Sequence, residues 1–217
     1  MYHIALLNTF TAAEKLRMAN LKKNLILSIL TASLAVVVLF AFDEKVWVFS
    51  KNLIPSDFFL IPKALSKRGL YLLYFIFAGL LIYSFFKKDN KLKGICWAYI
   101  KTQLIFSFGV VRCMKIVFGR ARPKYGGEFT FFSFDSHYNS FPSGHSADAF
   151  VSGVFLYYLL KYSKYSRLRF LPLAYAFLIA FSRVMVSAHY PSDAVAGMVI
   201  GILGAYYILT KYSDQPR

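Results

Sequence analysis

The chain has 217 residues, of which 58% are hydrophobic, 19% aromatic and only 17% charged. Soluble globular proteins carry about 25% charged and about 45–50% apolar residues, so the composition excludes an ordinary soluble domain and indicates a membrane protein. The formal net charge of +16 would suit a nucleic-acid-binding protein. However, the basic residues form short clusters between long apolar runs, as in loops that flank membrane helices. We therefore expect a phospholipid bilayer as the partner and no nucleic acid.

Apolar runs long enough to cross a bilayer recur along the chain. A hydrocarbon core of about 30 Å needs about 20 apolar residues per helix, and an α-helix pairs all of its backbone groups internally in lipid. We therefore predict an all-α polytopic membrane protein, a bundle of six transmembrane helices at residues 24–42, 70–86, 95–118, 145–160, 170–189 and 193–210.

The predicted domain organisation is a single six-helix domain at residues 24–217, preceded by a cytoplasmic lead-in at residues 1–23. In the lead-in, Leu6, Phe10 and Ala13 have helical spacing, which suits an amphipathic helix on the membrane surface. A flexible lead-in is the alternative. In the last predicted helix, a G-x-x-x-G motif at residues 197–201 predicts close helix packing within the bundle rather than a dimer interface.

Lys and Arg are divided unequally between the two sets of loops. Residues 1–23 and the segments after the second, fourth and sixth predicted helices carry more of them than the loops at 43–69, 119–141 and 190–192. By the positive-inside rule, both termini are then cytoplasmic and the latter loops face outward. The aromatic residues of the outer 43–69 loop, which include Trp47, fit a belt at headgroup level. A flank for lipid entry is the alternative.

Ionisable residues beside apolar runs are concentrated in three stretches: Lys115–Pro123 (KIVFGRARP), Pro142–His145 (PSGH) and Ser182–Asp193 (SRVMVSAHYPSD). In the predicted topology, all three stretches lie at the outer end of the bundle. Ionisable groups inside membrane segments are costly and are functional candidates by default. Their agreement in level predicts one polar site at the outer face.

Three cations of these stretches are predicted to bind an anion. Lys115 and Arg122 are two helical turns apart and so share a helix face, and Arg183 comes from another helix. The three would repel one another without an anion between them, and Arg donors match phosphate oxygens. Ser143 and Gly144 precede the fourth helix, where free N–H groups and a missing side chain let an anion approach. The alternative is snorkelling of the cations to lipid headgroups.

Two histidines and an aspartate supply groups for nucleophilic and acid–base chemistry. Asp193 follows His189 by four residues, so its carboxylate can hold one ring nitrogen protonated and leave the other free as a nucleophile. His145 is then available as a general acid toward the leaving oxygen. A metal site that adds His137 to these three is the alternative. Because the neighbouring cations disfavour a divalent ion, we expect no metal and no other cofactor.

Three further residues are accessory candidates. Arg112 lies one turn before Lys115 and could extend the positive pocket. Arg120 could contact the substrate or lipid headgroups. Asp148 lies one turn after His145 and could form a hydrogen bond in the site or neutralise a cation.

These motifs resemble those of the type 2 phosphatidic acid phosphatase (PAP2) superfamily, which are K-x6-R-P, P-S-G-H and S-R-x5-H-x3-D. The chain matches them at Lys115, Arg122 and Pro123, at Pro142–His145, and at Ser182, Arg183, His189 and Asp193. The resemblance implies a metal-independent phosphatase in which His189 attacks phosphorus, Asp193 orients it and His145 protonates the leaving group. It implies that the phosphoryl oxygens are bound by Lys115, Arg122 and Arg183, with Ser143 and Gly144 assisting.

The substrate implied by the resemblance is a phosphate monoester or pyrophosphate carried on an amphiphilic lipid, hydrolysed at the periplasmic face of the bacterial inner membrane. Residues 119–123 and 132–146 are similar to bacterial lipid A phosphatases, particularly those acting at the 1-position. Undecaprenyl pyrophosphate phosphatases, phosphatidylglycerophosphate phosphatases and lipid phosphotransferases share the same skeleton. An anion-binding transporter is the non-enzymatic alternative, and it would need inward-facing half-sites. We expect the 124–141 loop to select the headgroup.

Overall fold

The computed structural model describes the chain from residue 2 to residue 213, apart from residues 54, 56 and 57. Of residues 2–23, 25, 26 and 213, only the backbone is described. Within this part of the chain the fold is helical, and an isolated bridge between Arg120 and Phe129 is the one pairing of extended backbone. The predicted all-α class is confirmed.

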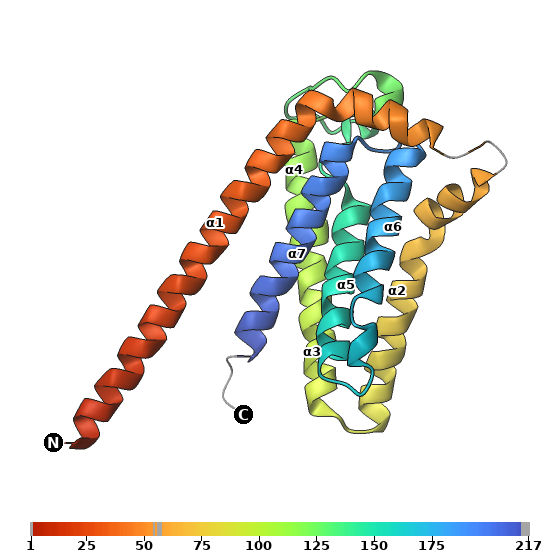
Figure 1. Cartoon of the computed structure of the whole chain (residues 1–217). Helices are drawn as coiled ribbons and strands as arrows, with labels where there is room; N and C mark the ends of the chain where they lie inside the picture. Colours follow the sequence, from red (N-terminus) through yellow and green to blue (C-terminus); the bar gives the residue numbers. More distant parts are fainter. Residues whose placement is uncertain (1, 54, 56–57, 214–217) are drawn as a thin grey trace.

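Helix α5 lies in the middle of the bundle, with α6 and α7 beside it and α1, α2, α3 and α4 around them (Figure 1). The α-helices are α1 (Tyr2–Asn52), α2 (Leu60–Phe86), α3 (Asn90–Thr102), α4 (Val111–Phe118), α5 (Gly144–Lys161), α6 (Leu171–Met185) and α7 (Pro191–Ser213). A π-helix, η2 (Gln103–Val110), joins α3 to α4. Short 3-10 helices are η3 (Pro123–Tyr125), η4 (Ser136–Tyr138) and η5 (Ser166–Leu168).

Four helical segments of the described chain are long and apolar enough to cross a membrane: Leu60–Phe86, Asn90–Phe118, Ser166–Met185 and Pro191–Tyr212. Helix α1 adds a fifth if Leu27–Phe40 and Asp43–Asn52, which are bent by 73° relative to each other, form one span. The predicted count of six is therefore not confirmed. Helix α5 has 18 residues and contains His145 and Asp148. It packs mainly against α6 and α7, so it has less need of an apolar surface.

Helices α5 and α6 form the core together with α2 and α3. Val151, Phe155 and Ile179 are fully buried, and the rings of Phe77 and Tyr99 stack with their centroids 3.6 Å apart. Inside a bilayer, such packing stabilises through close van der Waals contact rather than through release of water. The core therefore fixes the relative positions of the helices that carry the motif residues.

Gly197 and Gly201 bring α7 directly against the backbone of α5. A Cβ added at Gly197 would lie 2.2 Å from the carbonyl oxygen of Ser143, and one at Gly201 would lie 2.5 Å from the carbonyl oxygen of Ala147. The G-x-x-x-G motif therefore packs two helices of the bundle against each other, as predicted.

We expect Gly201→Ala to lower the free energy of unfolding by about 1–3 kcal/mol, the usual effect of overpacking a close contact. Gly79→Ala on α2 is the matched control, because a Cβ there would meet nothing within 4 Å. Since Ala favours a helix over Gly, the control should be neutral or stabilising. Thermal unfolding midpoints measured in one detergent test this, and equal midpoints for the two variants would contradict the packing role.

The outer part of α1 lies across the end of the bundle (Figure 1). Residues 43–52, predicted as loop, are helical, and residues 60–69 belong to α2. The indole Nε1 of Trp47 donates a hydrogen bond to Ser187 Oγ at 3.1 Å, and its ring lies 6.0 Å from that of Tyr190. Trp47 therefore packs on the turn before α7 and is not simply a residue of the predicted aromatic belt.

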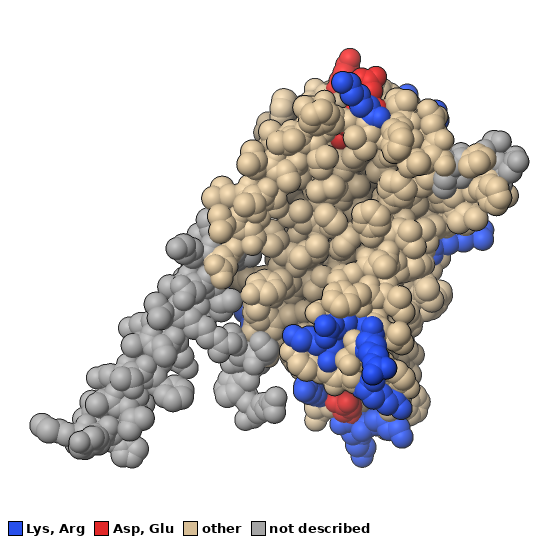
Figure 2. All heavy atoms as spheres, in the orientation of Figure 1, with Lys and Arg blue, Asp and Glu red and all other residues tan. Residues whose placement is uncertain are grey.

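Charged side chains gather at the two ends of the bundle and leave a band without charge between them (Figure 2). The end at which α2 joins α3, and α5 joins α6, carries the Lys and Arg residues of 87–93 and 161–169. The three motif stretches lie at the opposite end, where α4 ends and α5 and α7 begin.

Candidate active site

The three motif stretches meet at one end of the bundle. Lys115 lies in α4, His145 in the first turn of α5 and Arg183 in the last turn of α6, while Arg122 directly precedes η3 and His189 directly precedes Tyr190 and α7. The charges of Lys115, Arg122 and Arg183 all act on His145, and those of Lys115 and Arg183 also act on His189. The structure thus brings the predicted phosphate-binding cations to both histidines.

His189 is held primarily by a backbone carbonyl. Helix α6 ends at Met185, before the predicted 189, and Ser187 adopts a left-handed φ of 57° that turns the chain. His189 is buried, and its Nδ1 lies 2.8 Å from the carbonyl oxygen of Ser140. A carbonyl only accepts, so we assign the proton to Nδ1, which leaves Nε2 with a free lone pair. Asp193 Oδ2 is 3.8 Å from Nδ1, beyond hydrogen-bond length.

Asp193, expected to contact the imidazole directly, acts on it mainly through Ser140. The carboxylate is fully buried in the first turn of α7. Its Oδ2 accepts hydrogen bonds from Ser140 Oγ at 2.6 Å and from the backbone N–H of Tyr190 at 2.8 Å. Because the Ser140 carbonyl holds His189, the carboxylate fixes the imidazole in two steps. Sequence spacing predicted the proximity of His189 and Asp193 but not the intermediate Ser140.

Arg120 does not face lipid headgroups, which corrects the sequence expectation. Its guanidinium is buried. Nη1 donates to Asp193 Oδ1 and to Ser192 Oγ, and Nη2 donates to Asp43 Oδ2, all at 2.8 Å. Both terminal nitrogens are therefore used inside the protein, where Arg120 connects two buried carboxylates.

Aromatic rings enclose the same guanidinium. The Arg120 Cζ lies 4.7 Å from the ring centroid of Phe40, 5.3 Å from that of Phe129 and 4.2 Å from that of Tyr190. Cation–π contacts of this kind are worth about 2 kcal/mol when the cation is desolvated. They connect Arg120 to α1, to the 119–141 loop and to the turn before α7.

Asp43 is a site residue that the sequence analysis did not single out. It lies at the bend of α1, and its Oδ1 accepts a hydrogen bond from the Ser192 N–H at 2.8 Å. Its Oδ2 accepts hydrogen bonds from the Ser192 hydroxyl and from Arg120. The available signal was an acidic residue directly after a long apolar run, where an ionised group is costly unless it is paired.

Two predicted phosphate-binding residues have buried donors without a partner. Arg183 Nη1 donates to the carbonyl and hydroxyl oxygens of Ser66 on α2, at 3.2 and 2.7 Å, whereas its Nε has no partner in the described chain. Arg122 Nε is also buried without a partner there. Lys115 Nζ donates to the Asn139 carbonyl and has three donors in all. An unsatisfied buried donor is costly, and phosphate oxygens would satisfy these groups.

Ser143 and Gly144 start α5 and differ in what they offer to a ligand. Ser143 Oγ accepts from the Ser146 N–H at 3.4 Å and lies 2.9 Å from Ser146 Oγ, and its own N–H donates to the Asp193 carbonyl at 2.9 Å. Ser143 is thus engaged within the protein. A Cβ on Gly144 would meet only one methyl group, at 3.8 Å. The space beside Gly144 and the N–H groups of this helix start suit an anion.

The remaining accessory candidates lie on the side of the site toward α2 and α4. Arg112 is exposed, and its charge acts on Lys115. Asp148 Oδ2 accepts a hydrogen bond from the Tyr74 hydroxyl of α2 at 3.0 Å. Asp148 is therefore bound by a tyrosine and forms no ion pair with a cation in the described chain.

The alternative metal site receives no support from the arrangement of donors. In the part of the chain that the structure describes, no three His, Cys, Asp or Glu side chains gather as ligands. His137, which that alternative would use, is exposed on the 119–141 loop and lies 3.3 Å from Asp135. The sequence prediction of a site without metal stays a prediction.

Burial, the largest influence, lowers the pKa of His189 from 6.5 to about 3. The contact with Asp193 opposes this shift, whereas the positive charges of Lys115 and Arg183 add to it. His189 is therefore neutral at neutral pH, which is the state in which an imidazole can act as a nucleophile.

Acid is expected to destabilise the fold through His189. Between pH 6.5 and about 3, the unfolded chain binds a proton at this residue that the folded chain does not bind. The free energy of unfolding then falls with pH, by at most about 1.4 kcal/mol per pH unit. Thermal unfolding from pH 7 to pH 4 should show a shallower decline for His189→Gln. His137→Gln, which removes an exposed imidazole, is the control. A slope unchanged in His189→Gln would contradict a buried neutral imidazole.

Relatives with assigned activities match part of the chain. A lipid A 1-phosphatase of Rhizobium etli is 40% identical over 118 residues, which cover 52% of this chain and 48% of the relative. A lipid A 1-phosphatase of Rhizobium johnstonii is 38% identical over 109 residues, with coverages of 48% and 43%. The chain thus spans about half the length of these relatives. The bacitracin transport permease protein BcrC of Bacillus licheniformis is 27% identical over 143 residues, with coverages of 64% and 65%.

Solved structures share the fold, and a family model matches the greater part of the sequence. Aquifex aeolicus LpxE superimposes with a TM-score of 0.58 at 24% identity, covering 78% of this chain and 95% of that protein. The PAP2 type phosphatidylglycerolphosphate phosphatase of Bacillus subtilis gives 0.61 at 20% identity, with coverages of 87% and 97%. The model of the PAP2 superfamily matches residues 68–217, which contain all three motif stretches. The chain therefore belongs to the PAP2 superfamily.

Proposed function

We propose that this protein is a metal-independent lipid phosphatase that hydrolyses a phosphate monoester or pyrophosphate of an amphiphilic lipid through a phosphohistidine intermediate. The observation that carries the proposal is a buried neutral imidazole, His189, beside guanidinium groups whose Nε donors have no partner in the described chain. A phosphoryl group satisfies the donors of Arg122 and Arg183 and places phosphorus within reach of the imidazole.

In the first half-reaction, His189 Nε2 attacks phosphorus as the bond to the lipid oxygen breaks. The Ser140 carbonyl accepts the Nδ1–H throughout and so keeps the attacking nitrogen unprotonated. His145, which begins α5, donates a proton to the departing oxygen. Lys115, Arg122 and the start of α5 stabilise the charge on the phosphoryl oxygens, the kind of electrostatic contribution that dominates phosphoryl transfer.

In the second half-reaction, water attacks the phosphohistidine. His145, deprotonated by the first step, takes a proton from this water, and inorganic phosphate leaves with restoration of His189. The phosphoryl-binding cations serve both steps, because the same oxygens carry the charge each time.

For the substrate we propose lipid A, hydrolysed at its 1-phosphate. The support comes from the two curated lipid A 1-phosphatases, whose identities of 40% and 38% exceed the 27% of BcrC. The structural neighbours support the fold alone. Undecaprenyl pyrophosphate and phosphatidylglycerophosphate are the competing substrates, and transfer of the phosphoryl group to a second lipid is the competing reaction.

For the topology we propose a bacterial inner-membrane protein with six spans, in which α1 and α5 join the four apolar helices. Both termini are then cytoplasmic and the site faces the periplasm. The excess of Lys and Arg on the loops opposite the site supports this orientation, and Figure 2 displays part of that basic end.

The test is phosphate release by the purified protein from lipid A, undecaprenyl pyrophosphate, phosphatidylglycerophosphate and phosphatidic acid, each with and without EDTA. We expect the highest kcat/KM for lipid A and no effect of EDTA. Another lipid at the top of the ranking would overturn the proposed substrate, and loss of turnover in EDTA would overturn the metal-independent mechanism. Binding of every lipid without release of phosphate would favour the transporter alternative, and label that appears on a second lipid would favour a phosphotransferase.

A further inference from the structure

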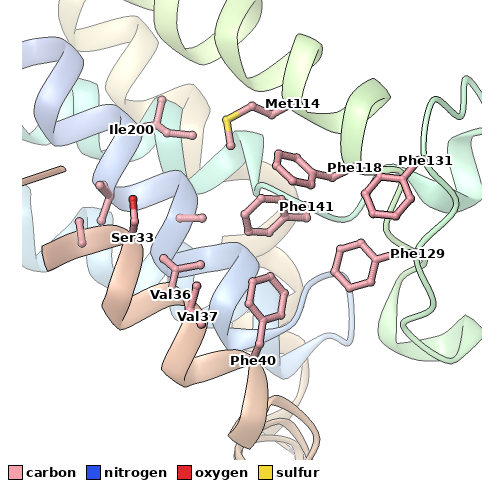
Figure 3. A pocket seen from close by; sticks show the side chains of 13 residues that line it. Ser33, Val36, Val37, Phe40, Met114, Phe118, Phe129, Phe131, Phe141 and Ile200 are labelled. Atoms are coloured by element: carbon pink, nitrogen blue, oxygen red, sulfur yellow. The ribbon is translucent and has the colours of Figure 1, made fainter. Parts of the chain in front are cut away.

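An apolar pocket of about 490 Å³ lies between α1, α4, α7 and the 119–141 loop (Figure 3). Val36 and Val37 contribute from α1, Met114 from α4 and Ile200 from α7. Ser33 supplies the single polar side chain among the lining residues, and none of them is charged. The volume is typical of a site for a small ligand.

The chemistry of this lining selects a hydrocarbon occupant. A buried water needs two to four polar partners, which one Ser33 hydroxyl does not provide, and an ion would have no counter-charge. Val37 and Phe131 line the pocket and are also 62% and 64% exposed, so the pocket reaches the surface of the bundle. That surface lies along α7, a membrane span, and is covered by lipid chains in a bilayer.

The pocket is separate from the cationic site. None of Lys115, Arg122, Arg183 and His145 lines it. Arg183 instead turns toward Ser66 on α2, which is not among the helices that form the pocket. A chain in the pocket therefore does not belong to the lipid whose phosphate is held by these cations.

Two residues connect the pocket to the catalytic carboxylate. The rings of Phe40 and Phe129 line the pocket (Figure 3), and they also lie 4.7 and 5.3 Å from the guanidinium of Arg120. That guanidinium donates to Asp193. When the pocket is empty, the rings lose packing partners on one side, and they are free to move away from Arg120.

We propose that this pocket binds one acyl chain of a bilayer phospholipid other than the substrate, and that the bound chain holds the Phe40, Phe129 and Arg120 contacts in the geometry that positions Asp193. The binding claim stands on the lining of the pocket alone. The effect on turnover rests on the proposed function, because it requires the assigned role of Asp193.

Binding is tested by photo-crosslinking with a phosphatidylcholine that carries a diazirine on its acyl chain. The protein is purified in a detergent with a rigid steroid body, which supplies no linear chain. Val37→Phe narrows the pocket, and Val38→Phe is the matched control, because Val38 is the next residue on the same helix and does not line the pocket. We expect label on the peptide that contains Met114 in the wild type and in Val38→Phe, reduced by about fivefold or more in Val37→Phe, a usual size for a specific effect.

Equal labelling of that peptide in Val37→Phe would overturn the binding claim, as would label confined to other surfaces of the wild type. If Val37→Phe does not fold, Ala32→Leu, which also fills the lining, replaces it. This readout needs no catalysis, so it separates failure of the lipid site from failure of the proposed function.

The effect on turnover is tested with a water-soluble, short-chain lipid phosphate and increasing dioleoyl phosphatidylcholine, which has no phosphate monoester. We expect kcat to rise saturably by about fivefold or more with little change in KM, and no response in Val37→Phe. A purely competitive effect of phosphatidylcholine would assign the pocket to the substrate and overturn the proposal. A wild-type kcat that does not change while crosslinking persists would overturn the link to Asp193.

Discussion

Replacing His189 with Gln is expected to lower kcat by at least about 10⁴-fold, the scale seen when an enzyme loses its nucleophile. The Gln amide can still donate to the Ser140 carbonyl that accepts from Nδ1 in the wild type, so the backbone around the site should persist. The check is kcat on the best lipid substrate, together with the thermal unfolding midpoint of the same sample. Turnover within tenfold of the wild type would contradict the assignment of His189 as nucleophile.

His145→Ala supplies the complementary control, because the two histidines have different tasks. On a nitrophenyl phosphate, whose leaving group needs no proton, the first half-reaction should survive while attack of water becomes slow. Phosphoenzyme should then accumulate in His145→Ala, whereas His189→Gln should form none. Accumulation in neither variant, with turnover lost in both, would show that the two residues do not divide the reaction in this way.

Arg120→Leu is expected to lower the free energy of unfolding by about 3–5 kcal/mol, the usual result of removing one partner from a buried ion pair. Asp43 and Asp193 are buried, and each accepts a hydrogen bond from Arg120 at 2.8 Å. Without the guanidinium, two carboxylates would share a site with no counter-charge. The measurement is the unfolding midpoint in a mild detergent.

Arg122→Leu is the matched comparison, two residues along the chain. No hydrogen bond joins Arg122 Nε to the described protein, so stability should change little while the affinity for inorganic phosphate falls. Adding Asp43→Asn to Arg120→Leu should recover part of the lost stability, because one of the two unpaired charges is then absent. Equal unfolding midpoints for Arg120→Leu and Arg122→Leu would contradict the different placement of these two residues.

The sequence predicted the site well where its geometry is local. The four-residue spacing of His189 and Asp193 placed imidazole and carboxylate near each other, and the P-S-G-H turn predicted the start of α5. The direct contact was wrong in detail, because the Ser140 carbonyl lies between them in function. A backbone oxygen 49 residues away leaves no mark in the residue types from which a pattern is read.

The sequence predicted least where long-range packing decides. The bend of α1 at Asp43 and the use of Arg120 inside the protein depend on contacts across 77 residues. Residue 120 therefore resembled a further phosphate ligand, since Arg at a motif is usually read that way. The count of six spans rested on apolar length alone. Helix α5 carries polar residues inside the bundle, where neighbouring helices rather than lipid surround it.

The most direct measurement is covalent trapping of the intermediate with lipid A labelled at its 1-phosphate. Purified protein is mixed with this substrate in EDTA, quenched in alkali, in which phosphohistidine survives, and digested for peptide mapping. The mechanism predicts label on His189, formed faster than phosphate is released by the same sample. Phosphate release with no label on the protein, or with label on a residue other than His189, would contradict it.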